Sequence, residues 1–492
     1  MLPHCRKLLL HIVALTFAVL GMMSQMTSPV FAEVTAFKQA VAETASRDKA
    51  LGAFYRANNF TAIWTGNTAE HKKRRRALFA ALRSVEDHGL PLARYQPDEL
   101  KSKMAKARSA RDLGMVEVEI SKVFLRYARD IQTGILVPSR VDNLIVRKVP
   151  YRDRASYLTS FEQSSPTAFM RALPPQTPEY ARLMKEKMKL ERTIAKGGWG
   201  ATVPGKKFEP GDSGKGVAAL RNRLIRMGFV RRSASTKYDA TIQKAVQQFQ
   251  ILHGLSPDGV TGVGTLSEIN KSAEARLQSV IVAMERERWL NKDRGKRHVL
   301  VNLTDFTAKI IDNGKVTFVS RSVIGQGALD RQSPEFSDVM EHMIINPTWN
   351  VPRSIATKEY LPQMQNNPNA AAHLKLYDGQ GREVSRGNIN FAQYTAKNFP
   401  FDIKQPPSNR NALGLVKFMF PNKHNIYLHD TPAKSLFSRE VRAFSHGCIR
   451  LHKPFEFAYA ILARQESSPK SYFQSKLKTG NETQVDLDEN IP

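Results

Sequence analysis

Cys448 is the residue with the clearest chemical potential in this sequence. It lies in Ser445-His446-Gly447-Cys448, and His429 stands upstream of it in the chain. An imidazole near a thiol can accept its proton and leave a thiolate, which is a strong nucleophile. A thiolate is also a good leaving group from a thioester. The pair therefore predicts acyl transfer through a covalent intermediate on Cys448.

The residues around the thiol indicate how that chemistry would be supported. Gly447 lets the backbone turn tightly, so that amides near Cys448 can point at a developing oxyanion, and His446 could add a donor there. His429, the expected base, needs an orienting group. Either the backbone carbonyl or the carboxylate of Asp430 could supply it.

Two alternatives involve the same residues. Cys448 could be inert packing, since free cysteines are often buried, although the neighbouring histidines argue against this. A zinc site is possible by ligand type, with His446, Cys448, His452 and His429 as ligands. No Cys-x-x-Cys or His-Glu-x-x-His spacing supports zinc, and the sequence implies neither a metal nor an organic cofactor.

The first 32 residues predict a secretory signal peptide. Arg6 and Lys7 precede an apolar stretch at 8–23, and Val30-Phe31-Ala32 carries small residues where a signal peptidase cuts. Cleavage after Ala32 would place the protein in the periplasm and remove Cys5. An uncleaved N-terminal anchor is the alternative, but the apolar stretch is short for a membrane span, and no later segment resembles one.

The charge balance points to an anionic partner. The chain carries 74 basic and 45 acidic residues, a formal net charge of +29. Such an excess favours a polyanion. Export argues against nucleic acid, and no zinc-finger spacing or RNA-stacking signature is present. An anionic wall polymer or a membrane surface fits better, although runs such as residues 72–76 are typical of solvated helix surfaces.

Pattern and length predict a multidomain α+β protein. Residues 33–196 are mostly helical in pattern, and a Gly- and Pro-rich linker follows. From about residue 297 to 464 the period is that of strands, with a hairpin signal at Asp312-Asn313-Gly314. A polar insertion at 352–410 interrupts them, and its length predicts a lid that packs over the Cys448 cleft with Tyr360 and Leu361 inward. Residues 465–492 are predicted to be a flexible tail.

Residues 211–270 predict a compact helical module between these two regions. Apolar residues at helical spacing mark one helix that ends at Gly228 and a second that ends at Gly254. With Tyr238-Asp239 and Asp258-Gly-Val-Thr-Gly262, the segment resembles the small three-helix peptidoglycan-binding module. The alternative is a helical spacer that binds nothing.

The strand-rich region resembles the YkuD-type L,D-transpeptidase domain. The family signature, a histidine followed by Ser/Thr-His-Gly-Cys, corresponds here to His429 and residues 445–448. The pieces Asn346–Pro352, Asn411–Gly414 and Lys417–Asn422 resemble the YcbB-like subgroup, which also carries a helical scaffold domain and a peptidoglycan-binding module. Arg450 replaces the Asn of many smaller members, as is usual in that subgroup.

This resemblance implies a substrate and a reaction. The enzyme would attack a tetrapeptide stem of peptidoglycan after its third, diamino-acid residue, release D-alanine, and pass the acyl group to the side-chain amine of another stem. Carbapenems would acylate Cys448. The residues predicted to bind substrate are Tyr427, Asp430, Ser445, Arg450, Trp349 and Arg442. The two arginines would engage stem-peptide carboxylates, and the two aromatic rings would line the cleft.

Several alternatives remain open for these residues. The same thioester could attach a protein to the wall or hydrolyse links, since the motif does not identify the acceptor. A wall-binding scaffold with a silent site is a rival of another class. Asp430 and Arg450 could equally be structural ion-pair partners.

Overall fold

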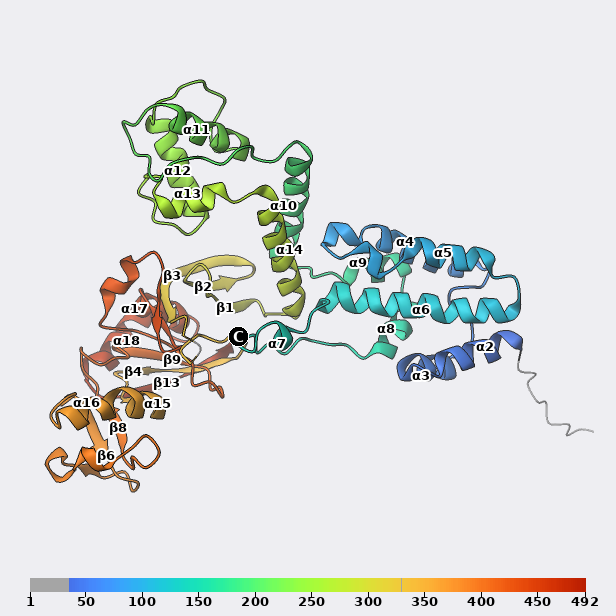
Figure 1. Ribbon diagram of the computed structural model, residues 1–492. Coiled ribbons are helices and arrows are strands. Elements are labelled where there is room, and N and C mark those ends of the chain that lie inside the picture. Colours follow the sequence, from blue (N-terminus) through green and yellow to red (C-terminus); the bar gives the residue numbers. More distant parts are fainter. Residues whose placement is uncertain (1–34, 329) are drawn as a thin grey trace, which may run out of the picture. The chain divides into compact units, whose positions relative to one another are not determined.

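The computed structural model describes residues 35–328 and 330–492 (Figure 1). The predicted signal peptide and its cleavage after Ala32 lie outside the described residues. Among the helices that the structure describes, none is both long and apolar enough to cross a membrane. The chain divides into two compact units.

The first unit is helical and comprises the described residues up to Ser84, together with Pro91–Ala128 and Arg152–Arg171. Its elements are α2 (Ala36–Ala45), α3 (Lys49–Ala57), α4 (Ala69–Arg83), η3 (Leu92–Arg94), α5 (Pro97–Lys106), most of α6 (Ala110–Thr133), α8 (Arg154–Glu162) and most of α9 (Pro166–Ala172). Side chains of Thr35, Asp48 and Thr68 accept amide hydrogens at the starts of α2, α3 and α4, as N-cap residues do.

The core of this unit is built around Trp64. Its ring packs against Phe124 and Phe161, with centroids 5.5 and 5.0 Å apart. The buried Glu117 carboxylate accepts hydrogen bonds from the Trp64 amide and the Tyr55 hydroxyl. A buried carboxylate is tolerated only when it is hydrogen-bonded in this way, so the unit is a packed helical domain, as its periodicity predicted.

The second unit begins with helical elements. These are η2 (Val85–His88), α7 (Pro138–Val141), α10 (Pro178–Ala195), α11 (Lys215–Met227), α12 (Ala240–Leu252), α13 (Val263–Asn270) and α14 (Ala273–Trp289). The helices α11, α12 and α13 form the predicted three-helix module around one apolar core. Gly228 ends α11 at φ +88°, the left-handed conformation typical of a helix C-terminus.

The rest of the second unit contains the large sheet that positions the candidate site. Within the described residues it has nine strands, in the order β1-β2-β3-β12-β10-β9-β4-β13, with β11 paired to β3. Their bounds are β1 (Arg297–Asn302), β2 (Thr307–Asp312), β3 (Lys315–Gly325), β4 (Met340–Ile345), β9 (Val416–Met419), β10 (Leu428–His429), β11 (Ala443–Ser445), β12 (Ile449–Leu451) and β13 (Thr483–Ile491). Asn313 and Gly314 join β2 to β3 with φ of +50° and +74°, which confirms the predicted hairpin.

One face of this sheet packs against two helices. Leu428, Ile449 and Phe418 point into a core that α17 (Pro454–Leu462) and α18 (Pro469–Lys478) complete with Phe457 and Phe473. Successive residues of a strand point to opposite sides of the sheet. The neighbours of these core-facing residues therefore point to the other face.

The prediction of a flexible tail at 465–492 was wrong. This segment forms α18 and β13, and β13 pairs with β4. Val485, Leu487 and Ile491 are buried although their neighbours are polar. The polar composition hid an alternating pattern that buries one face of an edge strand.

The insertion at 352–410 is a folded subdomain. It contains α15 (Arg353–Ile355), a π-helical turn η4 (Ala356–Tyr360), α16 (Leu361–Asn366), η5 (Arg386–Asn388) and η6 (Phe391–Gln393). A small sheet has the order β5-β8-β6-β7, from β5 (Trp349–Asn350), β8 (Asp402–Gln405), β6 (Lys375–Tyr377) and β7 (Glu383–Val384). Its own apolar core includes Leu361, with Tyr360 packed against it.

Candidate functional site

The candidate site is built on two neighbouring strands. β10 pairs in parallel with β12, so that His429 lies opposite Arg450 and Leu428 lies opposite Ile449. Because Leu428 and Ile449 face the core, His429 and Arg450 face the other side of the sheet. Tyr427 and Cys448 precede the core-facing residues and share the face of His429. The alternation of two strands thus brings the predicted residues together.

His429 is held in one tautomer by its own backbone neighbourhood. Its side chain is buried, and its Nδ1 donates a hydrogen bond to the carbonyl oxygen of Asp430. This bond requires the proton on Nδ1, so Nε2 carries the lone pair that a general base needs. Of the two orienting groups that the sequence offered at Asp430, the backbone carbonyl makes the contact.

The Asp430 carboxylate has a different role. It accepts hydrogen bonds from the Leu415 amide, at 3.0 Å, and from Lys434 Nζ. A Cβ added to Gly414, where φ is +62°, would lie 2.3 Å from this carboxylate. Gly414 therefore lets the carboxylate approach the backbone of the segment before β9, and so fixes the strand end that carries His429. The geometry gives the side chain of Asp430 a structural function, and its contact with substrate stays a prediction.

Cys448 sits between polar groups of other segments. The thiol donates to the carbonyl of Asn425 at 3.5 Å and is hydrogen-bonded to the Tyr427 hydroxyl. That hydroxyl is also bonded to Trp349 of β5, so a chain of contacts links the insertion to the sulfur. Within the described part of the chain, no hydrogen bond joins the thiol to His429.

The protonation states follow from burial. Burial raises the pKa of the Cys448 thiol to about 11, although hydrogen bonds from Tyr427 and the charge of Arg450 act in the opposite direction. Burial, together with the charge of Arg450, lowers the pKa of His429 to about 3. At neutral pH the resting site therefore holds a neutral thiol and a neutral imidazole rather than an ion pair.

The turn before the thiol is fixed by short hydrogen bonds. The buried Ser445 hydroxyl donates to the Cys448 carbonyl at 2.6 Å and accepts from the Gly447 amide. Gly447 has φ +116°, a backbone conformation that is unfavourable for any residue with a Cβ. Its carbonyl accepts a hydrogen bond of 2.6 Å from the hydroxyl of Ser333, a residue that the sequence did not single out. The Cys448 amide has no partner among the described residues.

His446 points to the insertion. Its Nε2 lies 2.7 Å from Oε1 of Glu359 in η4, and Arg331 bonds the same oxygen at 2.8 Å. No sequence signal marks Glu359, because this contact joins segments far apart in the chain. His446 therefore links the turn beside Cys448 to the insertion, and its predicted role as an oxyanion donor stays a prediction.

Arg442 uses its donors within the protein. Its guanidinium donates to backbone carbonyls of Ser322, Arg439 and Phe306, and it lies over the Phe306 ring. This arrangement gives Arg442 a structural role in holding the segment before β11. Its predicted contact with substrate carboxylates has no support in this geometry.

Unlike Arg442, Arg450 and Lys417 are cations without hydrogen-bond partners among the described residues. The Arg450 Nε is buried and has no hydrogen-bond partner in the described structure. Lys417 in β9 lies opposite His429 in the antiparallel ladder and therefore shares its face. Burial lowers the pKa of both groups. The sequence analysis predicted a role for Arg450 but missed Lys417, whose signal is a charge inside the apolar strand Val416-Lys417-Phe418.

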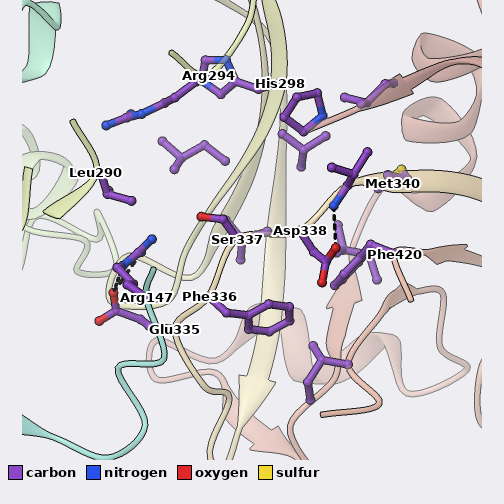
Figure 2. A pocket seen from close by; sticks show the side chains of 18 of the residues that line it. Arg147, Leu290, Arg294, His298, Glu335, Phe336, Ser337, Asp338, Met340 and Phe420 are labelled. Atoms are coloured by element: carbon purple, nitrogen blue, oxygen red, sulfur yellow. Dashed lines mark hydrogen bonds and ion pairs between the residues drawn. The ribbon is translucent and has the colours of Figure 1, made fainter. Parts of the chain in front are cut away.

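A separate cavity of about 520 Å³ lies on the core side of the sheet. Leu428 and Ile449 line it, so it opens opposite to the face of His429 and Cys448. Figure 2 shows Arg147 and Glu335 paired at one side and Met340 and Phe420 at the other. The cavity is thus not the site of the predicted chemistry. Among the residues that the structure describes, no cluster of His, Cys, Asp and Glu could hold a metal ion.

Comparison with known families identifies three parts of the chain. Residues 296–465 match a model of the L,D-transpeptidase catalytic domain (YkuD), residues 49–186 match a scaffold domain, and residues 213–269 match a model described as "Putative peptidoglycan binding domain". A curated relative from Haemophilus influenzae, named "Putative L,D-transpeptidase", is 31% identical over 166 residues. The match covers 33% of this chain and 33% of the relative, so the chain spans about one third of the length of that relative.

Two solved structures also show similarity. One is an L,D-transpeptidase from Xylanimonas cellulosilytica, 16% identical, covering 54% of this chain and 93% of that chain at a TM-score of 0.18. The other is a fused Zn-dependent amidase/peptidase/peptidoglycan-binding protein from Clostridium acetobutylicum, 15% identical, covering 50% and 90% at a TM-score of 0.13. At these TM-scores neither structure carries an argument about the fold.

Proposed function

We propose that this chain, whose residues 296–465 belong to the L,D-transpeptidase (YkuD) catalytic domain family, is a periplasmic enzyme that forms 3→3 cross-links in peptidoglycan. The observation that supports this most directly is the shared face of β10 and β12. It carries a thiol, an imidazole whose Nδ1 is bonded to the Asp430 carbonyl, and a guanidinium whose Nε has no partner among the described residues. A thiol and a nearby base are what acyl transfer from a peptide carbonyl to an amine requires.

The proposed reaction begins with proton transfer from the Cys448 thiol to Nε2 of His429 as substrate binds. The resulting thiolate attacks the carbonyl carbon of the third residue of a tetrapeptide stem. His429 then gives the proton to the nitrogen of the terminal D-alanine, and the carbon–nitrogen bond breaks. Because the resting pair is neutral, little thiolate is present before substrate binds, which limits side reactions of the thiol.

The tetrahedral oxyanion needs hydrogen-bond donors at the turn. The Cys448 amide, which no described residue engages, can donate to the oxyanion, and the positive φ of Gly447 orients it. In the second half of the reaction an amine from another stem attacks the thioester. His429 accepts the amine proton and passes it to the departing sulfur, so that the carbon–sulfur bond breaks and Cys448 leaves as the thiol.

The insertion favours an amine over water as acceptor in this proposal. It touches the site at two points, through Glu359 to His446 and through Trp349 to Tyr427. A subdomain fixed over the thioester would limit the access of water. The peptidoglycan-binding module would keep the enzyme on its polymeric substrate.

Muropeptide analysis tests this function. Purified protein should convert disaccharide-tetrapeptides into dimers linked between third residues, with release of D-alanine, as detected by mass spectrometry. Cys448→Ala should abolish the product while the protein stays folded, and His429→Ala should lower the rate by about a hundredfold. Carbapenem treatment should add one adduct at Cys448. Dimers from the Cys448→Ala variant would contradict the proposal, as would hydrolysis as the only reaction of the wild type.

The proposed location is tested separately. The intact mass of protein from a periplasmic extract should correspond to a chain that begins at Glu33, if cleavage follows Ala32. Full-length chain in the membrane fraction would contradict both the cleavage and the periplasmic location.

A further inference from the structure

Two cations lie on either side of His429 in the sheet. Arg450 is its cross-strand partner on β12, and Lys417 is its partner on β9. Directly opposed residues point to the same face, so both side chains share the face of His429. Their charges both act on the imidazole, since each lowers the pKa of His429. We call Lys417 and Arg450 the cation pair.

Among the described residues, neither member of the cation pair has an ion-pair partner. The Arg450 Nε is buried without a partner, and Lys417 forms no hydrogen bond or ion pair among the described residues. The nearby acids are engaged elsewhere. Asp430 binds Lys434 and the Leu415 amide, and Glu482, which acts on Lys417 only at a distance, accepts the Thr348 amide.

Two partly desolvated, unpaired cations are costly to a folded protein unless an anion joins them. The proposed reaction supplies one at this place. His429 must deliver its proton to the nitrogen of the leaving amino acid, and the carboxylate of that amino acid is two bonds from the nitrogen. When the nitrogen is within reach of Nε2, the carboxylate must lie within a few ångströms of the imidazole, where the cation pair flanks it.

We propose that Lys417 and Arg450 together bind the free α-carboxylate of the amino acid that leaves, and so select donor stems in which the scissile bond precedes the last residue. This inference rests on the proposed function and names the substrate feature that the site recognises. The carboxylate stays with the departing amino acid, and the cation pair undergoes no covalent change. Lys417 is thus a specificity-determining residue that the motif itself does not contain.

The arrangement also explains how a base with so low a pKa can work. A bound carboxylate offsets the two positive charges that hold the imidazole neutral. Proton transfer from Cys448 to His429 then becomes easier only when the correct leaving group is present. A donor without the carboxylate would leave the imidazole a weaker base, so that Cys448 would be acylated more slowly.

Paired substrates test the inference. A tetrapeptide muropeptide that ends in D-alanine is compared with one that ends in D-alaninamide, which has the same shape but no charge. We expect the wild type to prefer the acid by at least about tenfold in kcat/KM. Lys417→Met should lose most of this preference, because kcat/KM should fall for the substrate that ends in D-alanine and not for the one that ends in D-alaninamide. Lys417→Arg should retain the preference. Lys315→Met, an equal change of charge at the exposed β2–β3 hairpin, should behave as wild type.

A chemical probe gives a readout that does not depend on transpeptidation. Iodoacetate and iodoacetamide both alkylate Cys448, but only iodoacetate carries a carboxylate. The ratio of their rates should fall at least about threefold in Lys417→Met and in Arg450→Met, and should not change in Lys315→Met. If the wild type turns over neither muropeptide, the proposed function fails, and the alkylation ratio still decides the role of the cation pair. An equal loss with acid and amide substrates, or an unchanged alkylation ratio in Lys417→Met, would overturn the inference.

Discussion

Glu359 of the insertion and His446 of the turn before Cys448 are joined by a contact of 2.7 Å between Oε1 and Nε2. Arg331 binds the same carboxylate oxygen at 2.8 Å. The segment that would cover the thioester is therefore held by a side-chain contact to the turn that carries the nucleophile and by an ion pair with Arg331. Such a contact can keep the insertion closed without lying in the path of the reaction.

Glu359→Gln should loosen this contact. The amide still accepts one hydrogen bond but no longer attracts Arg331, and partly exposed ion pairs of this type contribute at most about 1 kcal/mol. We expect the ratio of hydrolysed to cross-linked product to rise about two- to fivefold, measured by mass spectrometry of muropeptides. Glu383→Gln removes an ion pair with Lys375 elsewhere in the insertion and should leave the ratio unchanged. Equal ratios in both variants would show that Glu359 does not control closure.

The pKa values of the resting site predict how Cys448 reacts with iodoacetamide. A thiol with a pKa of about 11 is mostly protonated at neutral pH, so its alkylation rate should rise about tenfold per pH unit from pH 7 to 10. His429, with a pKa of about 3, is already neutral throughout this range and adds no step of its own to the profile. A thiolate–imidazolium pair would instead give a flat profile, and that outcome would contradict the neutral resting state.

Tyr427→Phe supplies a second measurement on the same thiol. The Tyr427 hydroxyl lowers the pKa of Cys448, so its removal should raise that pKa further and slow alkylation at any pH below it. Trp349→Phe should have a smaller effect in the same direction, because it removes only the bond that positions the hydroxyl. Faster alkylation in Tyr427→Phe would show that the ring shields the sulfur rather than stabilising the thiolate.

The sequence could predict the centre of this site because its signals are local. Cys448, His446 and Gly447 are adjacent in the chain, and the strand pattern before His429 placed it at the end of a strand. The shared face of His429 and Cys448 follows from strand alternation once β10 and β12 are paired. The helical domain, two helices of the module and the β2–β3 hairpin were also predicted, since each depends on periodicity or turn residues within one segment, and the three-helix form of the module followed from its resemblance to a known family.

The residues that the sequence analysis missed act through pairing between distant segments. Lys417 reaches the site only because β9 lies beside β10 in one register, and a shift by one residue would turn it toward the core. Ser333, in a loop, and Glu359, in η4, contact the turn from segments whose positions no local pattern reveals. The sequence analysis also missed that residues 483–491 form a folded strand, β13, because the burial of this strand depends on its pairing with β4.

Gly414→Ala should destabilise the catalytic domain. An added Cβ would meet the Asp430 carboxylate at 2.3 Å, and the backbone φ of +62° strains any other residue. We expect a loss of about 2 kcal/mol or more in unfolding free energy, visible as a lower Tm in a thermal scan of the full chain. Activity should fall as well, because Asp430 fixes the strand end that holds His429.

Gly379→Ala is the matched control for this substitution. It lies in a turn of the insertion, and an added Cβ would have open space around it. Its Tm should stay within experimental error of the wild type. A similar loss of Tm in both variants would mean that the effect of Gly414→Ala is not caused by its approach to Asp430.

The peptidoglycan-binding module can be removed without breaking the helices that flank it. α10 and α14 pack side by side (Figure 1), and the segment between them in sequence, residues 196–272, contains the module. A short Gly-Ser bridge from Ala195 to Ala273 should therefore preserve this pair. We expect the shortened protein to sediment less with purified sacculi and to turn over a soluble muropeptide at the wild-type rate.

Because the chain has a net charge of +29, both proteins should be compared at low and raised salt. If the module binds the polymer specifically, the difference in sedimentation persists when surface charges are screened, whereas a difference that vanishes with salt would show that the module contributes only charge.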